Sequence, residues 1–277
     1  MCFALTFILV LFLSQDALTD AEEEFHQTYT VEADTEVEVS NINGIINISA
    51  WDEDYVDVRA LKRTREDRDE LDLVTIEVNT NDILEIKTVV QKRTEDEDSF
   101  FSRIFGKIYY KTPKVTVDYT IKLPESVILN RASTTNGDIE VYGTRGDSYV
   151  KTTNGDITVE NTDGLINAKS TNGRISITGG ALTKNARTTN GSIEASLSDN
   201  FIDGTSISTT NGSIDLYLSP DINADIELRT VNGKISAGGF RMLVETISKR
   251  EFVGTLGSGG KRITARTVNG SISLNKE

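Results

Sequence analysis

Basic side chains recur at a fixed spacing in the second half of this chain, and they are its most chemically suggestive residues. Lys151, Lys169 and Arg187 lie 18 residues apart, and Arg229 and Arg266 hold the equivalent place in later copies of the same short motif. Enzymes that cleave polysaccharides on a β-helix use Asp, Arg and Lys side chains on one face. A solvated face of mixed charge is the simpler interpretation, and we favour it over catalysis.

Histidine and cysteine are too scarce for the usual nucleophilic or metal chemistry. His26 is the only histidine and lies outside the repeated motifs, and Cys2 is the only cysteine. A Ser-His-Asp or Cys-His arrangement therefore cannot form within the repeats, and no Cys/His cluster exists for zinc or iron. Carboxylates near turns could bind Ca²⁺, but the Gly- and Asp-rich nonapeptide of calcium β-rolls is absent. We predict no catalytic residue, no metal site and no cofactor.

The basic residues belong to a motif that organises the whole chain. An Asn-Gly pair recurs at steps of 18, 18, 18, 21, 21 and 37 residues, and the last step is about two periods. The pairs, which we predict to be structural turns, are Asn136-Gly137, Asn154-Gly155, Asn172-Gly173, Asn190-Gly191, Asn211-Gly212, Asn232-Gly233 and Asn269-Gly270, with a further copy at Asn43-Gly44. Self-similarity at a fixed period is the signature of a repeat architecture.

Alternating polarity surrounds each Asn-Gly pair. The residue four before the Asn is always apolar, the residue three after it is always Ile, and the residue five after it is again apolar. A period of two indicates a strand, a tight turn and a second strand in every copy. We expect the Asn-Gly pair to lie where the backbone reaches positive φ, which Gly adopts freely and Asn tolerates.

Two all-β architectures satisfy this pattern. Asn-Gly between alternating strands is a strong hairpin signal, so a series of hairpins in a meander or sandwich is one. In the other, each copy is one coil of a solenoid, and in-register stacking places like residues on like. Because residue identity recurs and not only polarity, we favour a single β-solenoid, or β-helix, of 18–21-residue coils, with its handedness open.

The chain divides into three parts on composition. Residues 3–13 are an apolar run that is too short to span a membrane and is typical of a signal peptide, which we assign to residues 1–21. Residues 22–277 form the solenoid. It has irregular N-terminal coils over 22–130, with an inserted loop at 92–111, and a regular array over 131–277. We expect a secreted or cell-envelope, extracytoplasmic protein with no integral membrane span after signal removal.

Two stretches depart from the regular repeat. The charged run between Leu61 and Leu71 is predicted to be a solvated loop or a short exposed helix. Residues 240–261, including a Gly-rich segment, are predicted to be a coil that has lost its Asn-Gly pair.

Aromatic residues concentrate in the inserted loop. As possible partner contacts we name Phe100, Phe101, Ile104, Phe105, Tyr109 and Tyr110. An exposed apolar loop is typical of an interaction site, whereas a cap over an exposed end of the solenoid is the simpler interpretation.

Bulk charge limits the class of partner. The formal net charge is −14, or −12 without residues 1–21 and their two Asp. Such a charge opposes binding to nucleic acid, so we expect a surface protein or a glycan as partner instead.

The Thr-Thr-Asn-Gly-x-Ile repeats, the upstream segment from Ile42 to Trp51 and the closing motif from Thr267 to Ile272 together resemble a prokaryotic putative-adhesin family of unknown function. The resemblance covers residues 30–277 and implies an exported β-solenoid, without site residues to carry over. We therefore predict a non-enzymatic surface or envelope scaffold or adhesin. The alternatives are a polysaccharide-active enzyme on a β-helix, or an envelope sensor or accessory domain that docks through residues 98–110.

Overall fold

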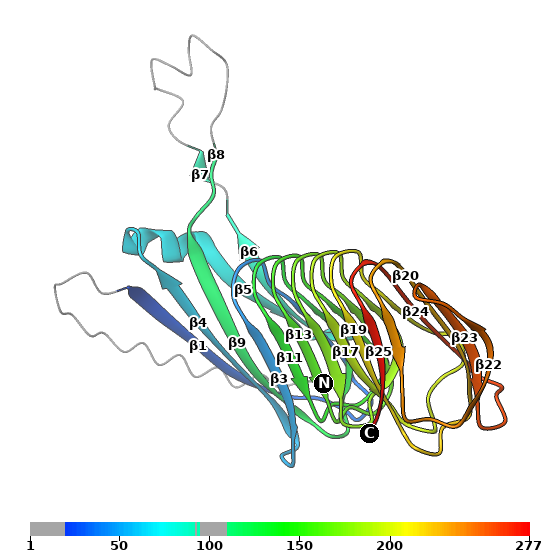
Figure 1. The fold of residues 1–277 in the computed structure, drawn as a ribbon. Coiled ribbons are helices and arrows are strands. Elements are labelled where there is room, and N and C mark those ends of the chain that lie inside the picture. Colours follow the sequence, from blue (N-terminus) through cyan, green and yellow to red (C-terminus); the bar gives the residue numbers. More distant parts are fainter. Residues whose placement is uncertain (1–19, 92, 95–109) are drawn as a thin grey trace, which may run out of the picture.

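The computed structural model describes residues 20–91, 93–94 and 110–277, which form two long β-sheets packed face to face (Figure 1). Sheet A has, in spatial order, β1 (Ala21–Thr30), β4 (Tyr55–Thr64), β9 (Val115–Pro124), β3 (Ile46–Trp51), β11 (Ile139–Tyr142), β13 (Ile157–Glu160), β15 (Ile175–Thr178), β17 (Ile193–Leu197), β19 (Ile214–Leu218), β25 (Ile272–Lys276) and β21 (Ile235–Ala237). Sheet B has β22 (Met242–Ile247), β23 (Glu251–Leu256), β20 (Ala224–Asn232), β24 (Arg262–Asn269), β18 (Thr205–Ser208), β16 (Leu182–Arg187), β14 (Leu165–Lys169), β12 (Ser148–Lys151), β10 (Ile128–Ser133), β2 (Glu36–Ser40), β6 (Leu84–Val90) and β5 (Val74–Asn79).

The Asn-Gly repeats wind between the two sheets. Each contributes a strand to sheet B, turns at its Asn-Gly corner and contributes the next strand to sheet A, so β10 to β19 alternate between the sheets. Neighbouring strands are parallel and in register, with Ile139 opposite Ile157 and Val150 opposite Ala168. The prediction of an all-β fold is confirmed. The alternative of successive hairpins is wrong for this part of the chain, because hairpin partners would be antiparallel.

The core is the thin layer between the sheets. The Ile three residues after the corner Asn is fully buried along sheet A from Ile46 through Ile193 to Ile272, and Ile235 on the edge strand β21 is partly buried. The apolar residue four before each Asn faces it from sheet B, as Ala168 and Ala186 do. Side chains of β-strands alternate between faces, so every second residue of both sheets points outward. The fold therefore presents two long outward faces.

At the C-terminal end, spatial order departs from chain order. Strands β24 and β25, from the last repeat, lie between β18 and β20 in sheet B and between β19 and β21 in sheet A. The intervening residues form β22 and β23, which pair antiparallel with each other, and β23 pairs antiparallel with β20. The prediction of a degenerate coil over residues 240–261 is therefore wrong: this stretch extends sheet B sideways as an edge hairpin.

At the N-terminal end, sheet A continues through the antiparallel strands β9, β4 and β1, and the 3-10 helix η1 (Arg68–Leu73) lies beside β4. The charged run between Leu61 and Leu71, which was predicted to be solvated, is only partly exposed to solvent. Lys62 lies on β4 with 8% of its side chain exposed, and its ammonium contacts Glu23 Oε1 at 2.7 Å and donates to the carbonyl oxygens of Leu71 and Val74 at 3.1 Å. A buried ammonium is tolerated because all three of its donors find acceptors.

A buried polar network closes the array at this end. Asn41 stands where later repeats have Thr or Ser, and its amide donates to the Val117 carbonyl at 2.7 Å. The Thr88 hydroxyl donates to Asn41 Oδ1 at 2.9 Å and lies 2.8 Å from the Tyr119 hydroxyl. Burial raises the pKa of the Tyr119 phenol to about 12. The network joins β9 of sheet A to β6 of sheet B across the core.

Candidate functional site

The Asn-Gly corners stack into one continuous ladder along the molecule. From Asn136 onward, the side-chain amide nitrogen of each corner Asn donates to the amide oxygen of the corner Asn before it in the ladder, at 2.7–2.8 Å. The order in space is Asn43, Asn136, Asn154, Asn172, Asn190, Asn211, Asn269 and Asn232. Because each amide uses a donor and an acceptor on its neighbours, the ladder fixes the register of the repeats.

Close approach of neighbouring corners accounts for the Gly of each pair. A Cβ on Gly155, Gly173 or Gly191 would lie 1.8–2.0 Å from the carbonyl oxygen of the preceding corner Gly. Gly137, Gly212, Gly233 and Gly270 are packed in the same way against their own neighbours. The corner Asn residues do not have positive φ, and Gly155 at 156° is close to extended. Packing, more than the positive φ expected from the sequence, therefore requires Gly here.

The outward face of sheet B carries the basic column. Lys151, Lys169 and Arg187 are opposite one another on β12, β14 and β16. The register continues from Arg187 through Ser208 to Arg266 and then to Arg229. We call Lys151, Lys169, Arg187, Arg266 and Arg229 the cationic row. All five side chains are exposed.

The first three members of the cationic row differ from the last two. Within the described residues, Lys151, Lys169 and Arg187 form no side-chain ion pair or hydrogen bond. Their charges therefore face solvent unneutralised by neighbours. An exposed ammonium or guanidinium of this kind keeps all its donors available to a ligand.

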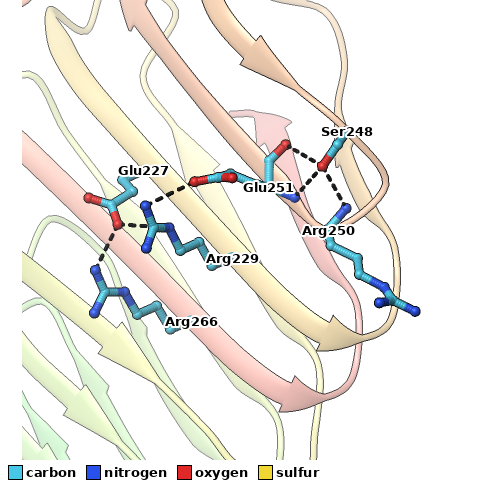
Figure 2. Close-up of polar contacts among 6 residues, drawn as sticks. All are labelled: Glu227, Arg229, Ser248, Arg250, Glu251 and Arg266. Carbon is cyan, nitrogen blue, oxygen red and sulfur yellow. Dashed lines mark hydrogen bonds and ion pairs between the residues drawn. The ribbon is translucent and has the colours of Figure 1, made fainter.

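The last two members belong to an arginine–glutamate cluster, drawn in Figure 2. Glu227 Oε1 accepts from Arg266 Nη2 at 2.7 Å and lies 3.1 Å from Arg229 Nε. Arg229 Nη2 also lies 2.9 Å from Glu251 Oε1, on the edge hairpin. The hydrogen bond from Arg266, helped by the charge of Arg229, holds the pKa of the Glu227 carboxyl below its usual range. The carboxylate is thus kept ionised, whereas a general acid needs a raised pKa.

A shallow cleft of about 520 Å³ opens beside this cluster. Val231 and Val268, which are 52% and 40% exposed, lie side by side there on β20 and β24. Arg250 also lines the cleft, and Figure 2 shows its guanidinium pointing away from the cluster. The Val pair was missed by sequence reasoning, although a signal existed: the residue before the corner Asn is Thr in the five preceding repeats and Val in these two.

The outward face of sheet A carries carboxylates along the repeat strands. On the outward face of sheet A, the residues four after the corner Asn pair in register and include Glu140, Glu194 and Asp215. The other members of this row are Asn47, Thr158, Ser176, Ser273 and Ser236. Glu160 adds a carboxylate to the next row. Along the repeat strands, sheet A therefore presents carboxylates outward where sheet B presents the cationic row.

The remaining sequence candidates are structural or lie outside the described residues. His26 Nε2 contacts Asp57 Oδ2 at 3.1 Å, and Arg59 Nε contacts the other oxygen of that carboxylate at 3.2 Å. Among the described residues, no group of three His, Cys, Asp or Glu side chains could hold a metal ion. Within the same ranges, no helix has the length and apolar character to cross a bilayer.

The next residues are those of the predicted partner-contact loop. Phe100, Phe101, Ile104, Phe105 and Tyr109 lie outside the described residues. The backbone of Tyr110 forms β8 (Tyr110–Lys111), which pairs antiparallel with β7 (Arg93–Thr94) at the base of the insertion.

Comparison with known proteins gives a family and a set of similar structures. The Toastrack DUF4097 family profile matches residues 131–275. Solved structures similar to this chain include a putative cell adhesion protein from Clostridium sporogenes, at 15% identity and a TM-score of 0.35, covering 94% of this chain and 100% of that one. A putative adhesin from Bacteroides fragilis has 13% identity and a TM-score of 0.42, covering 91% and 97%. One from Parabacteroides distasonis has 13% identity and a TM-score of 0.40, covering 92% and 97%. No curated protein matches.

Proposed function

Because this chain belongs to the Toastrack DUF4097 family, we propose that it is a non-enzymatic, extracytoplasmic scaffold whose outward sheet faces bind molecules at a cell surface. In this proposal residues 1–21 are a signal peptide, and residues 22–277 form one β-solenoid of 18–21-residue coils. The partner is a surface glycan or protein.

The observation that supports this proposal is the in-register repetition of outward side chains. On sheet B the same side-chain position recurs on β12, β14, β16, β18, β24 and β20. Neighbouring strands are about 4.8 Å apart, so each column is a straight row of like groups. Such a surface suits an extended or repetitive partner that contacts many equivalent groups at once. Each contact is weak, but together they give a high affinity.

The chemistry of the arginine–glutamate cluster favours binding over turnover. A retaining or inverting glycosidase needs one carboxyl group held protonated as the acid. Glu227 is held ionised by Arg266 and Arg229 instead. This arrangement argues against the polysaccharide-active enzyme that the basic column also suggested.

The test is a binding screen on glycan arrays and whole cells with the purified protein, run beside an assay for released oligosaccharides. Saturable binding without released product is the expected result. Release of oligosaccharide would overturn the proposal, and so would the absence of saturable binding to both glycans and cells.

Docking through residues 98–110 is a separate proposal with its own test. A variant lacking these residues, checked for folding by circular dichroism, is compared with the intact protein in the same cell-binding assay. Unchanged binding would exclude the loop as the contact, and lost binding would transfer the contact from the sheet faces to the loop.

A further inference from the structure

We infer that the cationic row on sheet B binds a linear polysaccharide of uronic acids, laid across the strands. This inference rests on the proposed surface-binding function and specifies both the face and the chemical class of its ligand. Between β12 and β20 the row spans five strand spacings, about 24 Å. It carries a cation on every strand except β18, where Ser208 stands.

The spacing of the row matches a periodic polymer. One cation per strand gives a positive charge about every 4.8 Å in a straight line, which is close to the advance of an extended sugar chain per residue. Lys151, Lys169 and Arg187 are exposed and have no intramolecular partner among the described residues. Binding a carboxylate therefore does not require breaking an existing ion pair, so little of the interaction energy is lost.

The neighbouring row supplies groups that suit sugar hydroxyls. Tyr149, Asn167, Asn185, Ser206 and Thr264 stand in register on the same outward face, two residues before the members of the cationic row or Ser208. On β20 this row ends in Glu227, whose carboxylate already contacts Arg266 and Arg229. Amides and hydroxyls both donate and accept, as a sugar hydroxyl does. The Asn185 amide already donates to Asn167 Oδ1 at 3.0 Å, and the oxygen of Asn185 remains an acceptor. Cations beside a row of amides and hydroxyls form the pattern expected for a carboxylated sugar chain.

The same face fits other polyanions less well. Binding of single-stranded nucleic acid relies on aromatic side chains for base stacking, and in these two rows Tyr149 is the sole aromatic residue, with Arg131 already over its ring at 5.2 Å. Insertion at a membrane surface needs apolar side chains beside the basic ones. The exposed large apolar side chains of sheet B lie at one end, with Val231 and Val268 in the cleft and Leu243, Val244 and Ile247 on the edge strand β22, and none lies on β12, β14 or β16.

The cleft beside the arginine–glutamate cluster lies at the end of the cationic row. Val231 and Val268 offer an apolar patch to the C–H face of a sugar ring, while Arg250 lies at the rim with its guanidinium directed outward. The polymer would then run from Lys151 toward this cleft, with the acidic face of sheet A repelling it from the opposite side.

The experiment measures binding of alginate oligomers, which are linear uronates, by calorimetry at several salt concentrations. The test variant combines Lys151→Gln, Lys169→Gln and Arg187→Gln. The control variant combines Arg174→Gln, Lys234→Gln and Lys276→Gln, which make the same change in net charge on exposed residues next to or within sheet A strands. Circular dichroism and thermal melts confirm that both fold.

The test variant should lose at least tenfold in affinity, and its dependence of log K on log salt should flatten by up to about two units, at about 0.7 per charge removed for a single-stranded polyanion. The control variant should keep the wild-type affinity. Ser208→Lys fills the gap in the row and should raise affinity severalfold. Equal losses in the two triple variants, or no alginate binding by the intact protein, would overturn the inference.

Three further ligands test whether the row selects uronates over other polymers. Neutral dextran of matched length should not bind. Tighter binding of polyphosphate or single-stranded DNA than of alginate would overturn the assignment to uronates. If cell binding persists while alginate binding is absent, the inference fails and the proposed function stands. Absence of saturable cell and glycan binding would remove both.

Discussion

Replacing a corner glycine tests whether close stacking of the repeats sets the stability of this fold. In Gly173→Ala, the new methyl would lie 1.8 Å from the Gly155 carbonyl oxygen, and about 1.6 Å of movement is needed to restore ordinary contact. That oxygen accepts the Ser170 hydroxyl at 3.0 Å, and the Gly155 amide donates to the Asn172 carbonyl at 2.9 Å. Movement on either side disturbs both bonds.

The cost can be estimated from these contacts. Overpacking a tight site costs about 1–3 kcal/mol, and weakening one or two hydrogen bonds adds about 1 kcal/mol each. We therefore expect Gly173→Ala to lower the free energy of unfolding by about 2–5 kcal/mol, a large share of the roughly 5–15 kcal/mol typical of a domain. The measurement is urea unfolding followed by far-ultraviolet circular dichroism.

Gly238→Ala is the matched control, because its Cβ would meet no atom within 4 Å and the residue does not require the left-handed region. It should be neutral, or stabilising by about 0.4–1 kcal/mol through the unfolded chain. Equal stability of the two variants would refute the reasoning that close approach demands glycine at the corners.

Three other predictions concern the core and the polar networks. Ile193→Asp buries a charge at a fully buried position and should cost more than about 4 kcal/mol, whereas Ile193→Val should cost about 1 kcal/mol; similar denaturation midpoints would contradict the assignment of this column to the core. Tyr119→Phe removes the hydroxyl beside Thr88 and should cost about 1 kcal/mol in thermal unfolding, with a stabilising effect as the contrary result. Because the pKa of Glu227 is lowered in the folded protein, its contribution to stability is present above the ordinary glutamate pKa of about 4.3 and is lost as the pH falls through the lower folded value. Glu227→Gln should therefore destabilise the protein by up to about 1 kcal/mol at pH 7, and this loss should shrink as the pH is lowered below about 4.3; a loss that does not change with pH would exclude the ion pairs as its cause.

The regular part of the fold can be predicted from the sequence because two features recur together: the alternation of polar and apolar residues, and the residue type at each position of the repeat. Ile157, Ile175 and Ile193 occupy one position in three copies, and stacking like on like is the arrangement that buries them all. The basic column could also be predicted, since the alternation of side chains along a strand by itself places Lys151, Lys169 and Arg187 on the face opposite the core.

What the sequence could not supply is the order of equivalent strands. Val231-Asn232-Gly233 and Val268-Asn269-Gly270 are nearly the same motif, so each fits the place next to Asn211 in local terms. Tertiary pairing with the edge hairpin decides between them, because β20 must contact both β23 and β24. The ion pair of Glu227 with Arg266 follows from this choice, so no local signal could have given it, whereas Arg229 lies two residues from Glu227 on the same face of β20.

The burial of Lys62 was hidden for a related reason. Its neighbours in sequence are charged, which predicts exposure to solvent, but its partners lie on the strands β1 and β5 and the 3-10 helix η1, which the fold brings together. Composition describes a segment's own preference, and tertiary contacts can override it at single positions.

The insertion of β24 and β25 between earlier strands makes the order of synthesis matter. In an array stacked strictly in chain order, loss of the last repeat shortens one end and leaves the rest joined. Here, loss of residues 262–276 would remove an interior layer, leaving β18 and β19 with open edges and separating β20 to β23 from the body. A nascent chain can therefore stack its earlier repeats as they emerge, but β20 to β23 can join them only after residues 262–276 have been made.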